Sequence, residues 1–261
     1  MNLLDEIAKK EKIKMKKKLL AGLAIGLFLV GGVSIAQATL IQDGDFVAWS
    51  SFSFVTDDPF VASPPPNTSN GNAVTVATGG NPGAFLQATH TMTYGDTIWT
   101  GGIKTDFSYN TAVDGAIDFL SVTADLLHPF AGATAWQLVI QQEGQRYYSF
   151  PFGAFSHNNS WLTATASNLV ATDFDTNPWA GNGGIIADGN QPDFGSAAMP
   201  LQFGFMFGNR LTGYGTLTNT LCLDNFSVST TSSPVPEPAT MLLFGTGLVG
   251  LVGSKVRRKK K

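Results

Sequence analysis

Two uncharged hydrophobic stretches, each bordered by a cluster of basic residues, bracket this chain. The first covers residues 19–35 and follows the lysines at 16–18, and the second covers residues 239–254 and precedes the basic tail at 255–261. Cations that flank a hydrophobic helix hold that end of the helix on the cytoplasmic side of a membrane. We therefore expect the long segment between the two stretches to lie outside the cytoplasm.

The segment between the two stretches is strongly acidic. From residue 39 to residue 254, sixteen Asp and Glu residues face only three basic residues, which are Lys104, Arg146 and Arg210. A surface with this excess of negative charge repels nucleic-acid phosphates and anionic lipid. The sequence therefore argues against nucleic acid as a partner, and it confines the other basic residues to the two ends.

Residues 1–38 have the three parts of a secretory signal peptide, which are a basic region, an apolar run and a small-residue cleavage site. The small residues are Ala36 and Ala38, and we expect signal peptidase to cut after Ala38. Met15 is a second candidate for the start of translation. The alternative interpretation is an uncleaved anchor, because 17 apolar residues approach the length that spans a bilayer.

Residues 232–261 combine a proline-rich linker, an apolar stretch and a basic tail. Each proline removes a backbone donor and biases its predecessor toward extended forms, so the linker is not helical. A helix over residues 239–254 would be about 24 Å long, against a hydrocarbon core of roughly 30 Å. The linker motif is Pro236, Glu237 and Pro238, and the basic residues that stop the helix at the membrane face are Lys255, Arg257 and Arg258.

In this order, and together with an N-terminal signal peptide, these features resemble the PEP-CTERM sorting signal of exosortase substrates. The resemblance covers residues 235–261. It implies a Gram-negative bacterium able to make exopolysaccharide, and an exosortase in the inner membrane that recognises the Pro-Glu-Pro sequence. It also implies a precursor held transiently in that membrane with its body in the periplasm, and a final location at the cell surface or outside the cell. The alternative is a plain tail anchor with a proline-rich spacer.

The body, residues 39–231, shows two-residue alternation and no helical period of useful length. Leu201, Phe203, Phe205 and Phe207, for example, put four large side chains on one face. Many short strands joined by Gly- and Asn-rich turns predict an all-β fold, an antiparallel two-sheet jelly-roll β-sandwich, flanked by the signal helix and the C-terminal transmembrane helix. We expect strands over residues 45–54, 73–77, 84–89, 103–109, 119–126, 136–141, 146–150, 201–207 and 221–228.

The first and last strands, residues 40–46 and 223–228, resemble the opening and closing strands of galactose-binding-like carbohydrate-binding modules, and residues 80–86 resemble lectin-like sandwiches. In galactose-binding-like modules these two strands are neighbours and often enclose a structural calcium ion. Val47 stands where such modules often have Glu. Asp43, Asp45 and Asp224 supply the oxygen ligands that Ca²⁺ prefers, and the alternative is that they are ordinary turn and strand-end carboxylates.

Aromatic side chains provide the candidate glycan-binding residues, because exposed Trp and Tyr rings stack on sugar faces. The candidates are Trp179, Trp161, Tyr147 and Tyr148, and the alternative is that these side chains belong to the core. The sequence contains no nucleophile elbow, no phosphate-binding loop and no pair of histidines at metal-ligand spacing, so we predict that the protein is not an enzyme.

The leading hypothesis is an exported cell-surface or extracellular-matrix protein that an exosortase processes and whose body binds polysaccharide. The first alternative is a secreted glycan hydrolase or lyase on a jelly-roll scaffold, which would use a pair of carboxylates. The second alternative is a structural matrix protein without a ligand.

Overall fold

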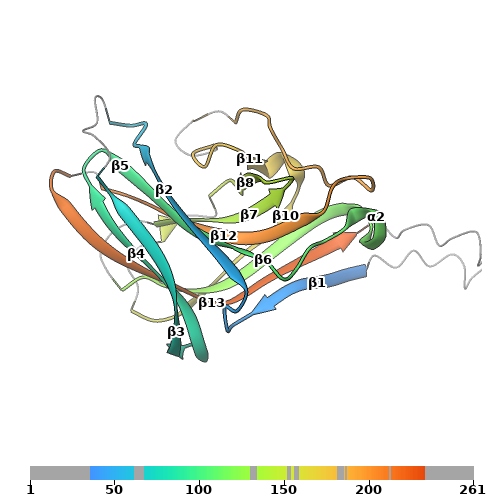
Figure 1. Ribbon diagram of the computed structural model, residues 1–261, viewed down its shortest axis with the longest axis horizontal. Helices are drawn as coiled ribbons and strands as arrows, with labels where there is room; N and C mark the ends of the chain where they lie inside the picture. Colours follow the sequence, from blue (N-terminus) through green and yellow to red (C-terminus); the bar gives the residue numbers. More distant parts are fainter. Residues whose placement is uncertain are drawn as a thin grey trace, which may run out of the picture. The chain divides into compact units, whose positions relative to one another are not determined.

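The computed structural model describes residues 36–61, 68–129, 134–151, 154–155, 159–180, 185, 187–211 and 213–232. Within these ranges the chain forms two antiparallel β-sheets, together with the short helix α2 (Thr111–Asp114) and a 3-10 turn at Ala171–Asp173 (Figure 1). The predicted all-β fold with two antiparallel sheets is confirmed. The predicted signal helix and transmembrane helix lie outside the described residues, and among the residues that are described no helix is long and apolar enough to cross a membrane.

The first sheet, here called sheet A, has the strand order β10-β6-β13-β4-β3. Its long central strand β13 pairs with β6 along one edge, and along the other edge with β4 and then β1. Its strands are β1 (Ala36–Asp43), β3 (Asn70–Gly80), β4 (Gly83–Thr93), β6 (Ile117–Leu127), β10 (Leu162–Leu169) and β13 (Thr216–Ser232).

The second sheet, here called sheet B, has the strand order β11-β8-β7-β12-β5-β2, and β9 also pairs with β7. The edge strand β2 and the strands β5 and β8 lie on the upper side of the molecule in Figure 1. Its strands are β2 (Trp49–Asp57), β5 (Asp96–Lys104), β7 (Thr134–Gln142), β8 (Gln145–Ser149), β9 (Ala154–Phe155), β11 (Phe174–Asp175) and β12 (Leu201–Arg210).

The main hydrophobic core fills the space between the two sheets, because each strand turns every second side chain inward. The predicted face of β12 is in this core, and Leu201, Phe203 and Phe205 are fully buried there. Val122 and Val228 from sheet A pack into the same cluster. The alternation in the sequence therefore identified the inner face of β12 correctly.

The first and last strands of the described chain, β1 and β13, are antiparallel neighbours (Figure 1). Asp43 pairs with Phe226 at one end of this pair of strands, and Ala36 pairs with Ser232 at the other. This confirms the neighbourhood that the resemblance to galactose-binding-like modules implied. It also places the backbone of the predicted cleavage-site residues Ala36 and Ala38 inside β1, directly beside the end of β13.

A buried polar contact joins the two sheets. His90 of β4 is fully buried, and its Nδ1 lies 2.7 Å from Asn209 Oδ1 of β12. Asn209 Nδ2 in turn donates to Thr134 Oγ1 at 2.6 Å, so the amide oxygen is the acceptor for a protonated His90 Nδ1. The pKa of His90 is lowered to about 4, mainly by burial; the hydrogen bond to Asn209 partly offsets this effect and the nearby His128 adds to it. The imidazole is therefore neutral in the folded protein at neutral pH.

Candidate functional site

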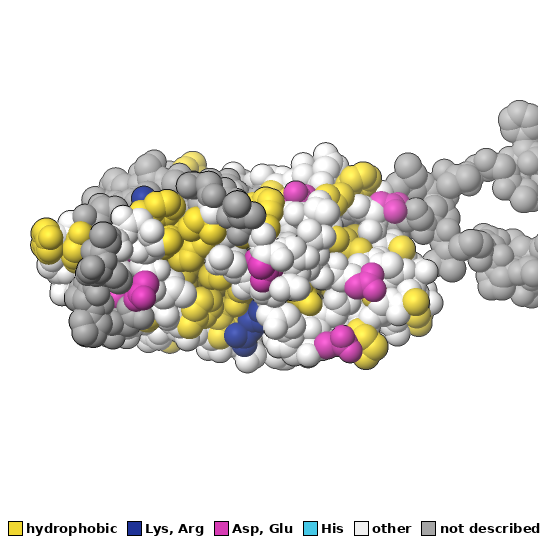
Figure 2. Space-filling view, turned by 90° about the horizontal axis from the view of Figure 1, so that it is seen from above, with side chains coloured by type: hydrophobic (Ala, Val, Ile, Leu, Met, Phe, Trp, Pro, Cys, Tyr) yellow, Lys and Arg dark blue, Asp and Glu magenta, His cyan; other side chains and the backbone are white. Residues whose placement is uncertain are grey.

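A second, smaller hydrophobic cluster lies on the outer face of sheet B, on the opposite side of that sheet from the main core. Phe52 and Phe54 of β2 point to this face because Trp49 and the main core occupy the other side of the strand. On the side of the sandwich where β2, β5 and β8 lie, hydrophobic side chains gather in the middle of the surface, with a basic side chain beside them (Figure 2).

Five rings of this outer face form a continuous series of ring contacts, which we call the aromatic ladder. Its centroids are 6.3 Å apart for Phe52 and Phe54, 6.4 Å for Phe54 and Trp99, 5.3 Å for Trp99 and Trp179, and 5.8 Å for Trp179 and Phe60. All these distances fall in the range of favourable aromatic pairs. The ladder joins two strands, β2 and β5, to the loop segments that carry Phe60 and Trp179.

Glycines in the sheet beneath the ladder let the rings lie directly on the backbone. A β-carbon at Gly208 would lie 2.1 Å from Trp99 Cζ3, and a β-carbon at Gly101 would lie 2.7 Å from Phe52 Cζ. Real side chains do not approach this closely, so only glycine leaves room for the two rings. The glycines of β5 and β12 thus have a specific role in shaping this face.

The middle of the ladder is buried and its ends are accessible. Trp99 and Trp179 are 1% and 6% exposed, and both indole nitrogens donate to Thr56 Oγ1, at 3.0 and 3.2 Å. Phe60 is 47% exposed, and Phe52 is half-buried. A ligand can therefore reach the two ends of the ladder, whereas the central indoles hold it together.

An arginine stacks on the ring at each end of the ladder. The Arg146 guanidinium carbon lies 4.2 Å from the Phe52 centroid, and the Arg210 guanidinium carbon lies 5.0 Å from the Phe60 centroid. Cations attract the faces of aromatic rings at these distances. Burial raises the pKa of Tyr148, the neighbour of Arg146 on the same face, and a hydrogen bond and the charge of Arg146 offset part of that rise.

The structure places the four glycan candidates from the sequence in different environments. Trp179 and Tyr148 are 6% and 7% exposed and belong to the outer-face cluster, where Tyr148 lies 6.1 Å from Phe54 between ring centroids. Tyr147, although adjacent to Tyr148, packs against the main core. Trp161 precedes β10 in sheet A and contacts Phe85 at 5.7 Å. The four side chains therefore do not form one accessible surface.

Sequence reasoning missed the phenylalanines of the ladder. The alternation of Phe52 and Phe54 around Ser53 puts both rings on one face of a strand, and this signal was present in the sequence. Their contacts with Trp99 and Trp179, however, join positions far apart along the chain. No spacing in the sequence indicates those contacts.

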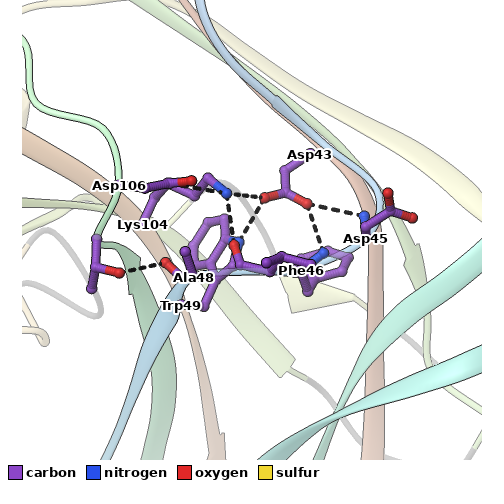
Figure 3. A network of polar contacts seen from close by, with 9 residues as sticks. Asp43, Asp45, Phe46, Ala48, Trp49, Lys104 and Asp106 are labelled. Carbon is purple, nitrogen blue, oxygen red and sulfur yellow. Dashed lines mark hydrogen bonds and ion pairs between the residues drawn. The ribbon is translucent and has the colours of Figure 1, made fainter.

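The Asp43 carboxylate, a predicted calcium ligand, is occupied by contacts within the protein (Figure 3). Asp43 Oδ1 accepts hydrogen bonds from the backbone nitrogens of Asp45 and Phe46 at 3.0 and 2.7 Å. Asp43 Oδ2 accepts from Trp49 Nε1 at 2.8 Å and lies 2.7 Å from Lys104 Nζ. Burial alone would raise the pKa of Asp43, but these bonds and the lysine charge outweigh it and lower the pKa.

The structure places the three predicted calcium ligands in different settings. The Asp45 side chain is exposed and points away from Asp43 (Figure 3), and Lys104 already balances the charge of Asp43. Asp224 accepts hydrogen bonds from the backbone nitrogens of Asn225 and Asn81 instead. Among the described residues, no group of three or more His, Cys, Asp or Glu side chains is placed to hold a metal ion.

The described chain ends with β13 at Ser232, and the predicted sorting residues lie outside it; these are Pro236, Glu237, Pro238, Lys255, Arg257 and Arg258. Residues 234–259 match the family model for the PEP-CTERM protein-sorting motif. The chain carries a PEP-CTERM sorting motif. This motif implies an exported protein that is anchored transiently at the membrane before an exosortase processes it.

No curated protein matches this sequence. Solved structures similar to it include the family 11 carbohydrate-binding module of the cellulosomal cellulase Lic26A-Cel5E of Clostridium thermocellum, with 12% identity, a TM-score of 0.40, and coverage of 78% of this chain and 99% of the module. A family 11 module of that organism in complex with a β-1,3-1,4-mixed-linked tetrasaccharide has 13% identity and a TM-score of 0.41, and the match covers 77% of this chain and 98% of the module. The CBM22-1-GH10 modules of xylanase 10B of C. thermocellum, complexed with xylohexaose, have 9% identity and a TM-score of 0.38, and the match covers 73% of this chain and 28% of that one.

Proposed function

We propose that this protein is an exported, exosortase-sorted surface protein whose sandwich binds polysaccharide through the accessible ends of the aromatic ladder, without catalysing a reaction. The observation that carries the proposal is the ladder itself, with the exposed Phe60 at one end, the half-buried Phe52 at the other and a buried indole pair between them. Sugar rings stack on accessible aromatic faces, and a row of linked rings suits a ligand with repeated sugar units. A matrix polysaccharide is such a ligand, and it is present where an exported protein arrives.

The geometry of the carboxylates also supports a binding role. Asp125 and Asp224 lie directly opposite each other on β6 and β13, but they are 8% and 0% exposed. Asp125 accepts hydrogen bonds from Thr163 Oγ1 at 2.6 Å and from Asn225 Nδ2 at 2.8 Å. This pair is committed to bonds within the protein, whereas the two carboxylates of a glycosidase flank an accessible glycosidic bond.

Replacing Phe60 by alanine is expected to weaken polysaccharide binding about tenfold, because one stacked ring contributes about 1.5 kcal/mol. The measurement is affinity electrophoresis of the full-length protein, in mild detergent, through gels that contain exopolysaccharide isolated from the producing bacterium. Phe119→Ala is the matched control, because Phe119 of β6 is 42% exposed and contributes no ring to the ladder. Equal retention of the two variants, or no retardation of the unmodified protein, would contradict the proposal.

A further inference from the structure

Both arginines of the acidic body lie at the ends of the aromatic ladder, on Phe52 and on Phe60. Lys104, the only other basic residue between positions 39 and 254, is held elsewhere by Asp43 at 2.7 Å and by Asp106 at 3.2 Å. The positive charge that remains available in this body is therefore confined to the ladder.

Arg146 has no carboxylate partner among the described residues, although the body is rich in acids. Its Nε is buried and, within the described chain, makes no hydrogen bond. The guanidinium carbon lies 4.2 Å from the Phe52 ring centroid, and the group also makes a hydrogen bond to the Tyr148 side chain. A guanidinium has five N–H donors, and two donors on one edge of the group bind a carboxylate through two parallel hydrogen bonds.

The other end of the ladder is different, because Arg210 already has a counter-ion. Arg210 Nη1 lies 3.6 Å from Asp58 Oδ1, and the Asp58 side chain is 1% exposed. The charge of Arg210 is thus largely balanced from within the protein. A negatively charged group of a ligand would therefore gain more binding energy at Arg146 than at Arg210.

We infer that the ligand of the ladder is an acidic polysaccharide, in which a uronic acid lies beside Phe52 and places its carboxylate on the Arg146 guanidinium. This inference rests on the proposed polysaccharide-binding function and names the class of ligand. The negative charge of the body opposes a polyanion at long range, but a Debye length of about 8 Å at physiological ionic strength limits that repulsion. The direct contact between guanidinium and carboxylate is screened much less.

Polygalacturonate and its fully methyl-esterified form test this inference, because they share a backbone and differ only in the free carboxylate. At physiological ionic strength, the full-length protein should be retarded more strongly by polygalacturonate than by the ester. Arg146→Gln should weaken retention by polygalacturonate about tenfold, the effect of losing one charge-assisted contact, and should weaken retention by the ester much less. Arg146→Lys keeps the charge but not the paired donors, so its retention should be intermediate.

The outcomes separate the inference from the proposed function. Equal retention by the two polymers, or an equal effect of Arg146→Gln on both, would overturn the uronate inference while the ladder remained a binding site. Retention by host exopolysaccharide that is sensitive to Phe60→Ala but not to Arg146→Gln would do the same. No retention by any of the three polymers would overturn both. Thermal unfolding of each variant checks that lost retention is not lost folding.

Discussion

Replacing Asp43 by alanine is expected to lower the free energy of unfolding by about 4 kcal/mol, the cost of removing one partner of a buried ion pair. Asp43 accepts three hydrogen bonds and is the nearer of the two carboxylates that hold Lys104. It also fixes a turn in which Phe46 and Ala48 have positive φ angles of 53° and 59°, a backbone region that costs a non-glycine residue roughly 1 kcal/mol. Without the carboxylate, this turn loses the bonds that hold it.

The measurement is urea unfolding followed by tryptophan fluorescence, because Trp49 donates one of the lost hydrogen bonds. Asp106→Ala is the matched control, since Asp106 is the second carboxylate on Lys104 and its side chain is 55% exposed. An exposed ion pair of this kind contributes at most about 1 kcal/mol. Equal destabilisation by the two substitutions would contradict the role assigned to Asp43.

Acidification from pH 7 to pH 4 is expected to remove about 3 kcal/mol of stability through His90 alone. The pKa of His90 is about 4 in the folded protein against 6.5 as its ordinary value. Between these values the unfolded chain binds a proton that the folded protein does not, so stability is complete above pH 6.5 and falls as the pH decreases toward 4. The lowered pKa values of Asp43 and Asp125 act below this window, because the ordinary pKa of Asp is 3.8.

Urea unfolding at pH 7, 5.5 and 4 measures this loss in the unmodified protein and in His90→Asn. Asparagine keeps a donor near Asn209 and has no charge to gain, so the pH dependence of the variant should be smaller by the His90 contribution. His128 also lies close to His90 and is present in both proteins, so its effect cancels in the comparison. If the free energy of unfolding depended on pH equally in both proteins, His90 would not titrate as the structure implies.

The sequence was sufficient to predict the strands whose two faces differ most. β7 and β12 alternate large apolar with small or polar residues, and Trp136, Leu138 and Phe205 are buried in the main core as expected. The strand predicted over residues 103–109 is wrong in most of its extent. β5 covers Asp96–Lys104 and ends there, and Tyr109 forms only an isolated bridge to Leu201.

The reason for this error is that β5 lies between two cores. Trp99 and Ile103 face the outer cluster, whereas Gly101 and Gly102 leave room for rings that come from other strands. A strand that is buried on both faces and contains glycines shows no clean alternation. The aromatic ladder was not predictable for the same reason, since its rings meet only after β2, β5 and the Trp179 segment have come together.

The sorting motif lies outside the described residues. The intact mass of the protein from its own host tests the expected export and processing most directly. In cells with an active exosortase, we expect an intact mass for a chain that begins at Thr39 and has lost the hydrophobic segment at 239–254 and the basic tail. In otherwise identical cells without the exosortase, the same N-terminus should be joined to the complete C-terminal segment. An identical mass with the basic tail retained in both strains would contradict the central claim that this protein is exported and processed through its PEP-CTERM motif.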